Sequence, residues 1–315
     1  MPSCTSEAHL RDVMPHASSI TARVSALPLL ALLAGGIAVG FSPIFVRLSD
    51  VPPMVSGFYR LALALPIFFA MGAFDVKARA TPPSGMTSRD FWLLVAVGLT
   101  FAADIAFWHL ALFYTSVADA TLLANMAPVF VTITAFFLFG ERISRSFAIG
   151  LALSLLGVAS LALQKNAGAE PPDRLLGNLL ALLAAIVYTA YMLLVARLRR
   201  RHSVQTVMIY STVISALSLL PFALLTSPSL LPPTLFSLAI LIALAAVSHV
   251  GGQGLFAYAL AHLPASLSSM MQLMGTAVAA LAAWAIFGEN LTWFKLASAA
   301  AILIGIWICQ RAARR

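Results

Sequence analysis

The sequence predicts an all-α membrane protein in which ten transmembrane helices are arranged as two inverted five-helix repeats. Three observations predict this fold class: an excess of apolar residues, ten long apolar runs and an internal duplication. Hydrophobic residues make up 61% of the 315 residues and charged residues only 10%, whereas a soluble domain is about half apolar and about a quarter charged. Too few polar residues remain to cover a soluble domain, so the chain length indicates a number of membrane spans.

The apolar runs are continuous and long enough to cross a membrane as helices, which takes about 20 residues. They are rich in Ala and Leu and lack the alternation of a membrane β-barrel. We therefore expect each run to be a helix. The ten predicted spans are 27–47, 54–74, 91–113, 118–139, 146–164, 175–196, 205–226, 235–260, 265–287 and 293–310.

The duplication is visible in residues 107–163, most of which recur 148 positions later. In the first copy Phe139-Gly140-Glu141 joins two apolar runs, and in the second copy Phe287-Gly288-Glu289 does the same. Gly157 falls on Gly305 at the same shift, without a gap. Such a register indicates a true repeat. Because each copy holds five spans, an odd number, the second copy must enter the membrane upside down relative to the first.

The distribution of Lys and Arg predicts the orientation. With a cytoplasmic N-terminus, the cytoplasmic segments hold 14 of the 19 Lys and Arg residues, the outer loops hold 4, and Arg60 lies within a span. Short cytoplasmic loops carry an excess of these residues. We expect a multi-pass protein of the bacterial inner (plasma) membrane with both termini cytoplasmic.

The domain organisation follows from these spans. The N-terminal segment is polar, lacks the apolar core of a signal peptide and is expected to be a disordered leader. Cys4 lies in the polar leader and Cys309 inside the last apolar run, at opposite ends of the chain. Two such cysteines define neither a disulfide framework nor a metal site. The predicted parts are a cytoplasmic leader at 1–25, a first repeat at 26–164, a linker at 165–174, a second repeat at 175–311 and a basic cytoplasmic tail at 312–315.

Particular residues give the chain a family resemblance. The ten-span pattern, the paired Phe-Gly-Glu turns, Ser42–Arg47 at the end of the first span and Phe58-Tyr59-Arg60 in the second resemble the drug/metabolite transporter superfamily, in particular its EamA-type members. The resemblance covers about residues 25–311. It implies a central cavity lined by spans one to four and six to nine, with spans five and ten at the periphery. It also implies transport of amino acids, metabolites, drugs or nucleotide sugars.

Two charged residues inside spans are candidate substrate-binding residues. Asp104 interrupts the third span, and a carboxylate in hydrocarbon is costly unless it faces the bundle interior or water, where it could bind a cationic group or a proton. Its structural alternative is a packing carboxyl satisfied by a neighbouring hydroxyl or amide. Arg60 could hold a substrate carboxylate by a forked pair of hydrogen bonds. Alternatively it could cap helix carbonyls or pair with Asp50 or Asp104.

The other candidates are aromatic or hydrogen-bonding side chains, which line small-molecule sites in an apolar wall. Each could equally serve packing between helices. His249 and Gln253 are four residues apart and are expected to share one helix face. Asn125 precedes Pro128, where a bend is expected. The remaining candidate substrate-binding residues are Trp108, Asn125, Tyr188, Tyr191, His249, Gln253 and Gln272.

The sequence argues against an enzyme. Glu141 and Glu289 look like a catalytic pair, but each follows Phe-Gly at a membrane boundary and precedes a new helix, whose N-terminus is partially positive. The inverted topology also places them on opposite faces. No glycine-rich phosphate loop, zinc-spaced His/Cys set or Gly-x-Ser-x-Gly motif is present. We therefore expect no catalytic residues, no cofactor and no bound metal.

These features predict a secondary transporter, an exporter of amino acids or related small metabolites working by alternating access. Arg60 and Asp104 could recognise the opposite charges of a zwitterion, with protons as a possible coupling ion. The expected partners are a small organic solute and the lipid bilayer, not nucleic acid, because the basic residues lie between apolar runs. The alternatives are an importer or exchanger of a nucleotide-like or S-adenosyl compound, an intramembrane lipid-modifying enzyme, and a non-transporting membrane interaction partner.

Overall fold

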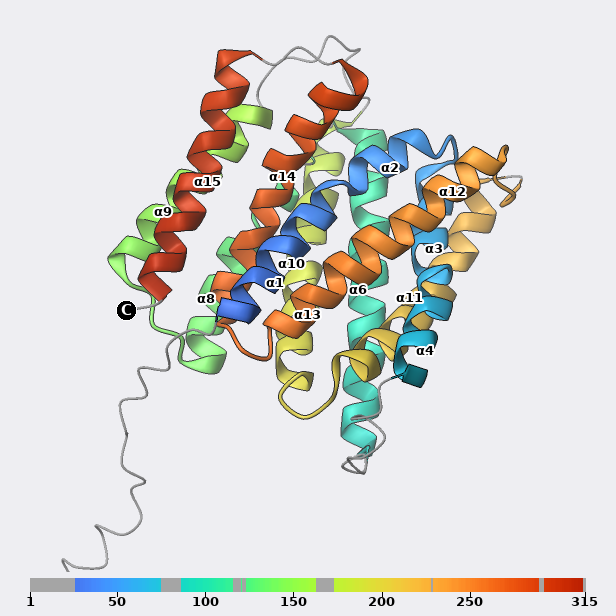
Figure 1. Ribbon diagram of the computed structural model, residues 1–315, viewed down its shortest axis with the longest axis horizontal. Coiled ribbons are helices and arrows are strands. Elements are labelled where there is room, and N and C mark those ends of the chain that lie inside the picture. The colour runs from blue at the N-terminus through green and yellow to red at the C-terminus, as the bar shows by residue number, and fades with distance from the viewer. Residues whose placement is uncertain are drawn as a thin grey trace, which may run out of the picture.

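The computed structural model is a bundle of helices, and the residues it describes contain no strand (Figure 1). The structure describes residues 26–74, 86–115, 120, 123–162, 173–227, 229–288 and 292–313. The predicted leader, most of the linker and Glu289 lie outside these residues.

The helices follow the predicted apolar runs closely. In the first half they are α1 (Ala26–Gly40), α2 (Ser42–Leu48), α3 (Pro53–Ala62), α4 (Ala64–Phe74), α6 (Ser88–Tyr114), α8 (Ala127–Phe139) and α9 (Arg145–Ala162). In the second half they are α10 (Arg174–Leu198), α11 (Val204–Thr226), α12 (Leu235–Ala243), the π-helix η1 (Leu244–Gln253), α13 (Gly254–Ala259), α14 (Ala265–Phe287) and α15 (Trp293–Ala313).

Eight continuous helical stretches in the described residues are long and apolar enough to cross a membrane, and two shorter apolar helices, Ala127–Phe139 and Arg145–Ser160, occupy the predicted fourth and fifth spans. Large apolar side chains cover the outside of the bundle, among them Phe137, 78% exposed, and Leu225, 84% exposed. An apolar surface of this extent is a membrane-facing surface. The protein is therefore a multi-pass membrane protein.

Several helices are interrupted near the middle of the bundle. The first span breaks at Phe41, two residues before Pro43 in the first turn of α2. The second span breaks at Leu63. A turn at Asn125 precedes α8, which carries Pro128 at its second position. Proline lacks the amide hydrogen that a helix interior requires but is tolerated in a first turn. The expected bend near Asn125 is thus present as a break between two helical segments.

The two Phe-Gly turns have the same backbone conformation. Gly140 has φ 66° and Gly288 has φ 65°, and each ends its helix in the left-handed region that glycine adopts without steric cost. Nothing lies within 4 Å of the position of an added Cβ at either glycine, so backbone conformation and not space requires glycine there.

Helices α9 and α15 pack side by side at one edge of the bundle (Figure 1). A Cβ on Gly150 would lie 2.6 Å from the Gly305 oxygen, and a Cβ on Gly157 would lie 2.8 Å from the Ser298 oxygen. Since the repeat relates Gly150 to Ser298 and Gly157 to Gly305, the two contacts are reciprocal. Between them, the Ser154 hydroxyl donates to the main-chain oxygen of the residue 148 positions later, at 3.1 Å. The two helices are antiparallel.

Glu141 lies at a helix N-terminus, but the expectation that this is the helix following it is wrong. Its carboxylate accepts hydrogen bonds from the Ala265 amide at 2.7 Å and the Ser266 amide at 3.2 Å, which begin α14 in the other half. The start of α9 is instead capped by Ser144, whose hydroxyl accepts from the amide three residues later at 3.1 Å. The left-handed turn at Gly140 carries Glu141 away from its own helix.

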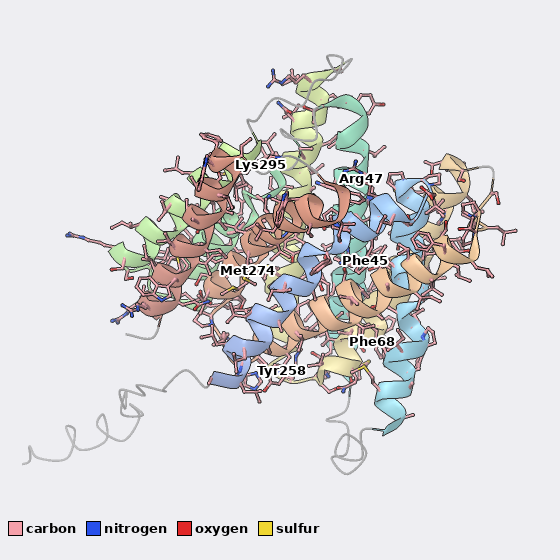
Figure 2. The ribbon with its side chains drawn as sticks, turned by 45° about the horizontal axis from the view of Figure 1, so that its top comes forward. Phe45, Arg47, Phe68, Tyr258, Met274 and Lys295 are labelled. Atoms are coloured by element: carbon pink, nitrogen blue, oxygen red, sulfur yellow. The ribbon has the colours of Figure 1, made fainter. Side chains whose placement is uncertain are left out.

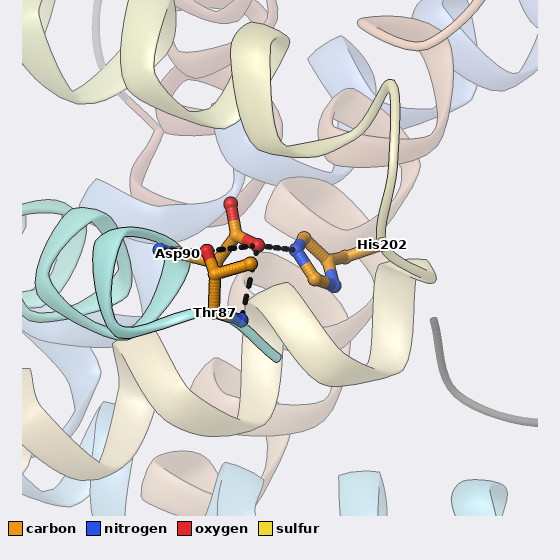
Figure 3. A network of polar contacts seen from close by, with 3 residues as sticks. All are labelled: Thr87, Asp90 and His202. Carbon is orange, nitrogen blue, oxygen red and sulfur yellow. Dashed lines mark hydrogen bonds and ion pairs between the residues drawn. The ribbon is translucent and has the colours of Figure 1, made fainter. Parts of the chain in front are cut away.

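A second polar contact joins the halves at the N-terminus of α6 (Figure 3). Thr87 and Asp90 form a capping box in which the Asp90 amide donates to the Thr87 hydroxyl at 3.1 Å. Nε2 of His202, in the turn after α10, lies 3.5 Å from the same Asp90 carboxylate. The start of α6 is thereby tied to the connection between α10 and α11.

Candidate functional site

The structure holds a cavity of about 520 Å³ between the two halves of the chain. It is bordered by α1, α2, α3 and α6 of the first half and by α10, η1 and α14 of the second. Seven of the nine predicted substrate-binding residues line it: Arg60, Asp104, Trp108, Asn125, Tyr188, Gln253 and Gln272. Tyr191 and His249 do not line this cavity.

Arg60 lies in the last turn of α3 and is positioned by a helix break. Its Nη1 donates to the Ser42 hydroxyl at 3.2 Å, and Ser42 is the first residue of α2, after the interruption at Phe41. Its Nε has no hydrogen-bond partner. Among the described residues Arg60 forms no ion pair with Asp50 or Asp104, although the charges of Arg60 and Asp104 interact electrostatically. The guanidinium therefore has donors left for a ligand.

Asp104 faces the same cavity from α6 and is half-buried. Within the described residues its carboxylate makes no hydrogen bond and no ion pair, so the neighbouring hydroxyl or amide of the structural alternative is not found. Two opposite charges, Arg60 and Asp104, thus border one cavity and interact electrostatically without forming an ion pair. A buried charge is costly unless it gains a partner, so both groups are candidates for binding a charged solute.

Tyr191 and His249 lie behind the cavity wall in an aromatic layer. The Tyr191 ring stacks on Phe101 at 4.7 Å between centroids, and the His249 ring stacks on Phe101 at 5.5 Å. Phe101 itself lines the cavity. Nε2 of His249 lies 2.9 Å from the Thr212 hydroxyl, and the side chain is only 1% exposed. In the described conformation Tyr191 and His249 therefore do not line the cavity, and their role as substrate-binding residues stays a prediction.

His249 and Gln253 both lie in the π-helix η1, which closes its hydrogen bonds over five residues and not four. The helix face that the two residues were expected to share does not bring both side chains into the cavity. Gln253 reaches the cavity while His249 packs against α6 and α11. The periodicity of an ordinary α-helix, which the sequence suggested, does not apply to this segment.

Ser42 is a cavity residue that sequence reasoning missed. It fixes Arg60 through a contact between residues 18 positions apart, which no local pattern reveals. Pro43 could have indicated it, because proline is common in the first turn of a helix and Ser42 is the polar residue directly before it. Ser42 and Asn125 border the cavity where a helix is interrupted, and Gln253 borders it at the end of the π-helix η1. Interrupted helices carry polar main-chain groups at the substrate sites of transporters.

The cavity reaches the surface at the end of the bundle that carries Arg47. Pro43 and Arg47 line it and are exposed. Figure 2 shows Arg47 and Lys295 at one end of the bundle and Tyr258 at the other. At the other end, the carboxylate of Glu141 is bound to the start of α14. The described conformation is thus open at one end and closed at the other.

Comparison with known proteins decides the class of protein. The model of the EamA-like transporter family matches residues 26–163 and again residues 175–310. The chain belongs to the EamA-like transporter family. Family members and the named relatives are transporters, not enzymes.

Several relatives of this EamA-like protein are known. A probable amino-acid metabolite efflux pump of Salmonella typhimurium is 28% identical, over 90% of this chain and 93% of the relative. An uncharacterized transporter of Archaeoglobus fulgidus is 27% identical over 89% of this chain and 95% of its own, while another from that archaeon matches over only 63% and 66%. The pseudopaline exporter CntI of Pseudomonas aeruginosa is 26% identical over 62% and 67%.

A solved crystal structure has the same fold. It superposes with a TM-score of 0.78 over 93% of this chain and 100% of the other, at 19% sequence identity. At that identity the likeness supports the arrangement of the helices and carries no information about the substrate.

Proposed function

We propose that this protein is a secondary transporter that exports amino acids or related small zwitterions by alternating access. The observation that supports this function best is the presence of two opposite charges, Arg60 and Asp104, that border one cavity open at one end and form no ion pair with each other. The similarity to a probable amino-acid metabolite efflux pump favours the same substrate class.

A zwitterion complements the cavity chemically. A guanidinium binds a carboxylate by charge-assisted hydrogen bonds, in forked geometry where both oxygens are reached, and Arg60 is held in place by Ser42 for this. Asp104 can accept from an ammonium group, and Trp108 and Tyr188 supply aromatic wall for an apolar side group. A substrate with only one of the two charges would leave the other partner desolvated and unpaired, which is unfavourable.

We further propose ten spans in two inverted repeats, 26–164 and 175–311. The two matches to the family model support it, as do the reciprocal contacts of α9 and α15. Arg47, at the end of the first span, lies over the Phe287 ring at 4.2 Å, and Arg200, after the sixth span, lies over the Phe139 ring at 5.2 Å. Each half thus contributes an arginine to the Phe-Gly turn of the other.

The orientation that the basic residues favour assigns the open end to the outer face of the membrane. In that orientation both termini are cytoplasmic, and the described conformation is outward-open. Asp104 is the one carboxylate bordering the cavity in the described residues, so it is the group we assign to proton coupling. A proton on Asp104 would weaken its hold on an ammonium group, which links proton binding to release of the substrate.

Substrate binding and transport test this function. In proteoliposomes, Arg60→Ala and Asp104→Asn should each lower uptake of the transported amino acid at least about tenfold, because each removes a charged partner. A thermal-shift screen of the purified protein against amino acids, nucleotides and cationic drugs identifies the substrate, since ligand binding to the folded state raises its melting temperature.

Lys295→Ala and Asp173→Asn are matched controls, because they remove the same kinds of charge outside the cavity. Both should transport like the wild type. Wild-type transport by Arg60→Ala and Asp104→Asn would remove these residues from the site and with them the zwitterion proposal.

A further inference from the structure

The closed end of the cavity is held by contacts between the two halves of the chain. Glu141, from the first half, binds the start of α14 in the second half. Near that end Arg200 lies over the Phe139 ring, and His202 lies 3.5 Å from the Asp90 carboxylate. Among these contacts, that of Glu141 is the one in which a carboxylate accepts several hydrogen bonds from the other half of the chain.

The bond network of Glu141 is chemically strong. Oε1 accepts from the Ala265 amide at 2.7 Å, and Oε2 accepts from both the amide and the hydroxyl of Ser266. These donors begin a helix of 23 residues, whose N-terminus favours a negative charge. Charge-assisted hydrogen bonds are roughly twice as strong as neutral ones. No residue of the second half supplies this cap, because the residue before Ala265 is Pro264, which forms no side-chain cap.

Helix α14 connects this contact to the cavity. Its first residues bind Glu141, and about two and three turns further Gln272 and Thr276 line the cavity. Ala265 also belongs to the same buried cluster as Val131 on α8 and Val195 on α10. If the cavity is to open at this end, α14 must separate from the first half, and the hydrogen bonds to Glu141 must break.

We infer that Glu141 is a latch that stabilises the conformation closed at this end, and that its release accompanies opening to that side. The inference rests on the proposed alternating-access function. Glu141 does not line the cavity, so its effect on transport arises from the balance between the two conformations and not from contact with substrate.

The latch predicts a population shift in the absence of substrate. In a background with Cys4→Ser and Cys309→Ala, two reporters are compared in purified full-length protein in nanodiscs. The first reporter is Val195→Cys, because Val195 is only 1% exposed and lies at the closed end. The second reporter is Ala279→Cys, because Ala279 lines the open cavity. With Glu141→Gln, the rate of N-ethylmaleimide labelling of Val195→Cys should rise about tenfold, while that of Ala279→Cys should fall.

A matched control separates the latch from an ordinary helix cap. Asp173 is also a carboxylate at a helix N-terminus, but it accepts at 3.1 Å from Leu176 of its own helix, α10. Asp173→Asn should leave both labelling rates unchanged. Unchanged rates in Glu141→Gln, or a rise at both reporters that indicates loss of the fold, would overturn the latch. Because no substrate is used, this result is independent of whether Arg60 and Asp104 bind one.

Discussion

Arg60 is positioned by a partner on another helix. The hydroxyl of Ser42 holds Nη1 of this guanidinium at 3.2 Å and leaves Nε without a partner. The candidate role of Arg60 could be predicted from its position within an apolar span, because a charge inside a span is costly. Its partner could not be predicted, since the helix break at Phe41 decides which side chain of the first span turns toward the second.

Ser42→Ala should weaken substrate binding without greatly lowering stability. The substitution removes one neutral acceptor, so the apparent affinity should fall by roughly fivefold, corresponding to about 1 kcal/mol. The measurement is the concentration dependence of transport or of the thermal shift. Ser56→Ala is the matched control, because Ser56 also lines the cavity but donates at 2.8 Å to Pro53 of its own helix. Equal affinities of the two variants would contradict the role of Ser42.

At the scale of elements, long apolar runs predicted nearly every helix, whereas contacts and irregular turns escaped prediction. Hydrophobic length determines where a span exists, so α10, α11 and α14 lie within a few residues of their predicted limits. The π-helix η1 has no hydrophobic signature of its own. Gln253 lines the cavity as expected, whereas His249 contacts Thr212 instead. Glu141 was predicted at a helix N-terminus, but the tertiary fold selects which helix.

The packing of α9 against α15 depends on small residues. A Cβ on Gly305 would collide with the Ser154 hydroxyl and the Gly150 oxygen, so the two backbones would have to move apart. Gly305→Ala should therefore destabilise the protein by about 1–3 kcal/mol and lower its melting temperature in detergent. Gly72→Ala is the control, because the nearest atom to its added Cβ lies at 4.0 Å. The packing argument fails if both variants melt at the same temperature.

The whole molecule has two chemically different ends. Arg47 and Lys295 lie at the end where the cavity opens (Figure 2). Arg142, beside the latch residue Glu141, and the arginines that follow α10 belong to the closed end. Because cytoplasmic segments of membrane proteins carry an excess of Lys and Arg, the orientation that we propose places the closed end in the cytoplasm. Under the proposed export function, the described conformation is then the one that releases the solute.

Labelling of introduced cysteines in intact cells tests this orientation. In the background lacking Cys4 and Cys309, Lys295→Cys should react with a membrane-impermeant maleimide added outside. Arg142→Cys should react only after the membrane is permeabilised. In the proposed orientation, 14 of the 19 Lys and Arg residues lie on the same side of the membrane as Arg142, and such an excess of positive charge marks the cytoplasmic side. Reaction of both cysteines from outside would show that the two ends do not face opposite sides. Reaction of Arg142→Cys alone would show that the protein has the opposite orientation. The open cavity would then face the cytoplasm, and the described conformation would be the one that loads an exported solute.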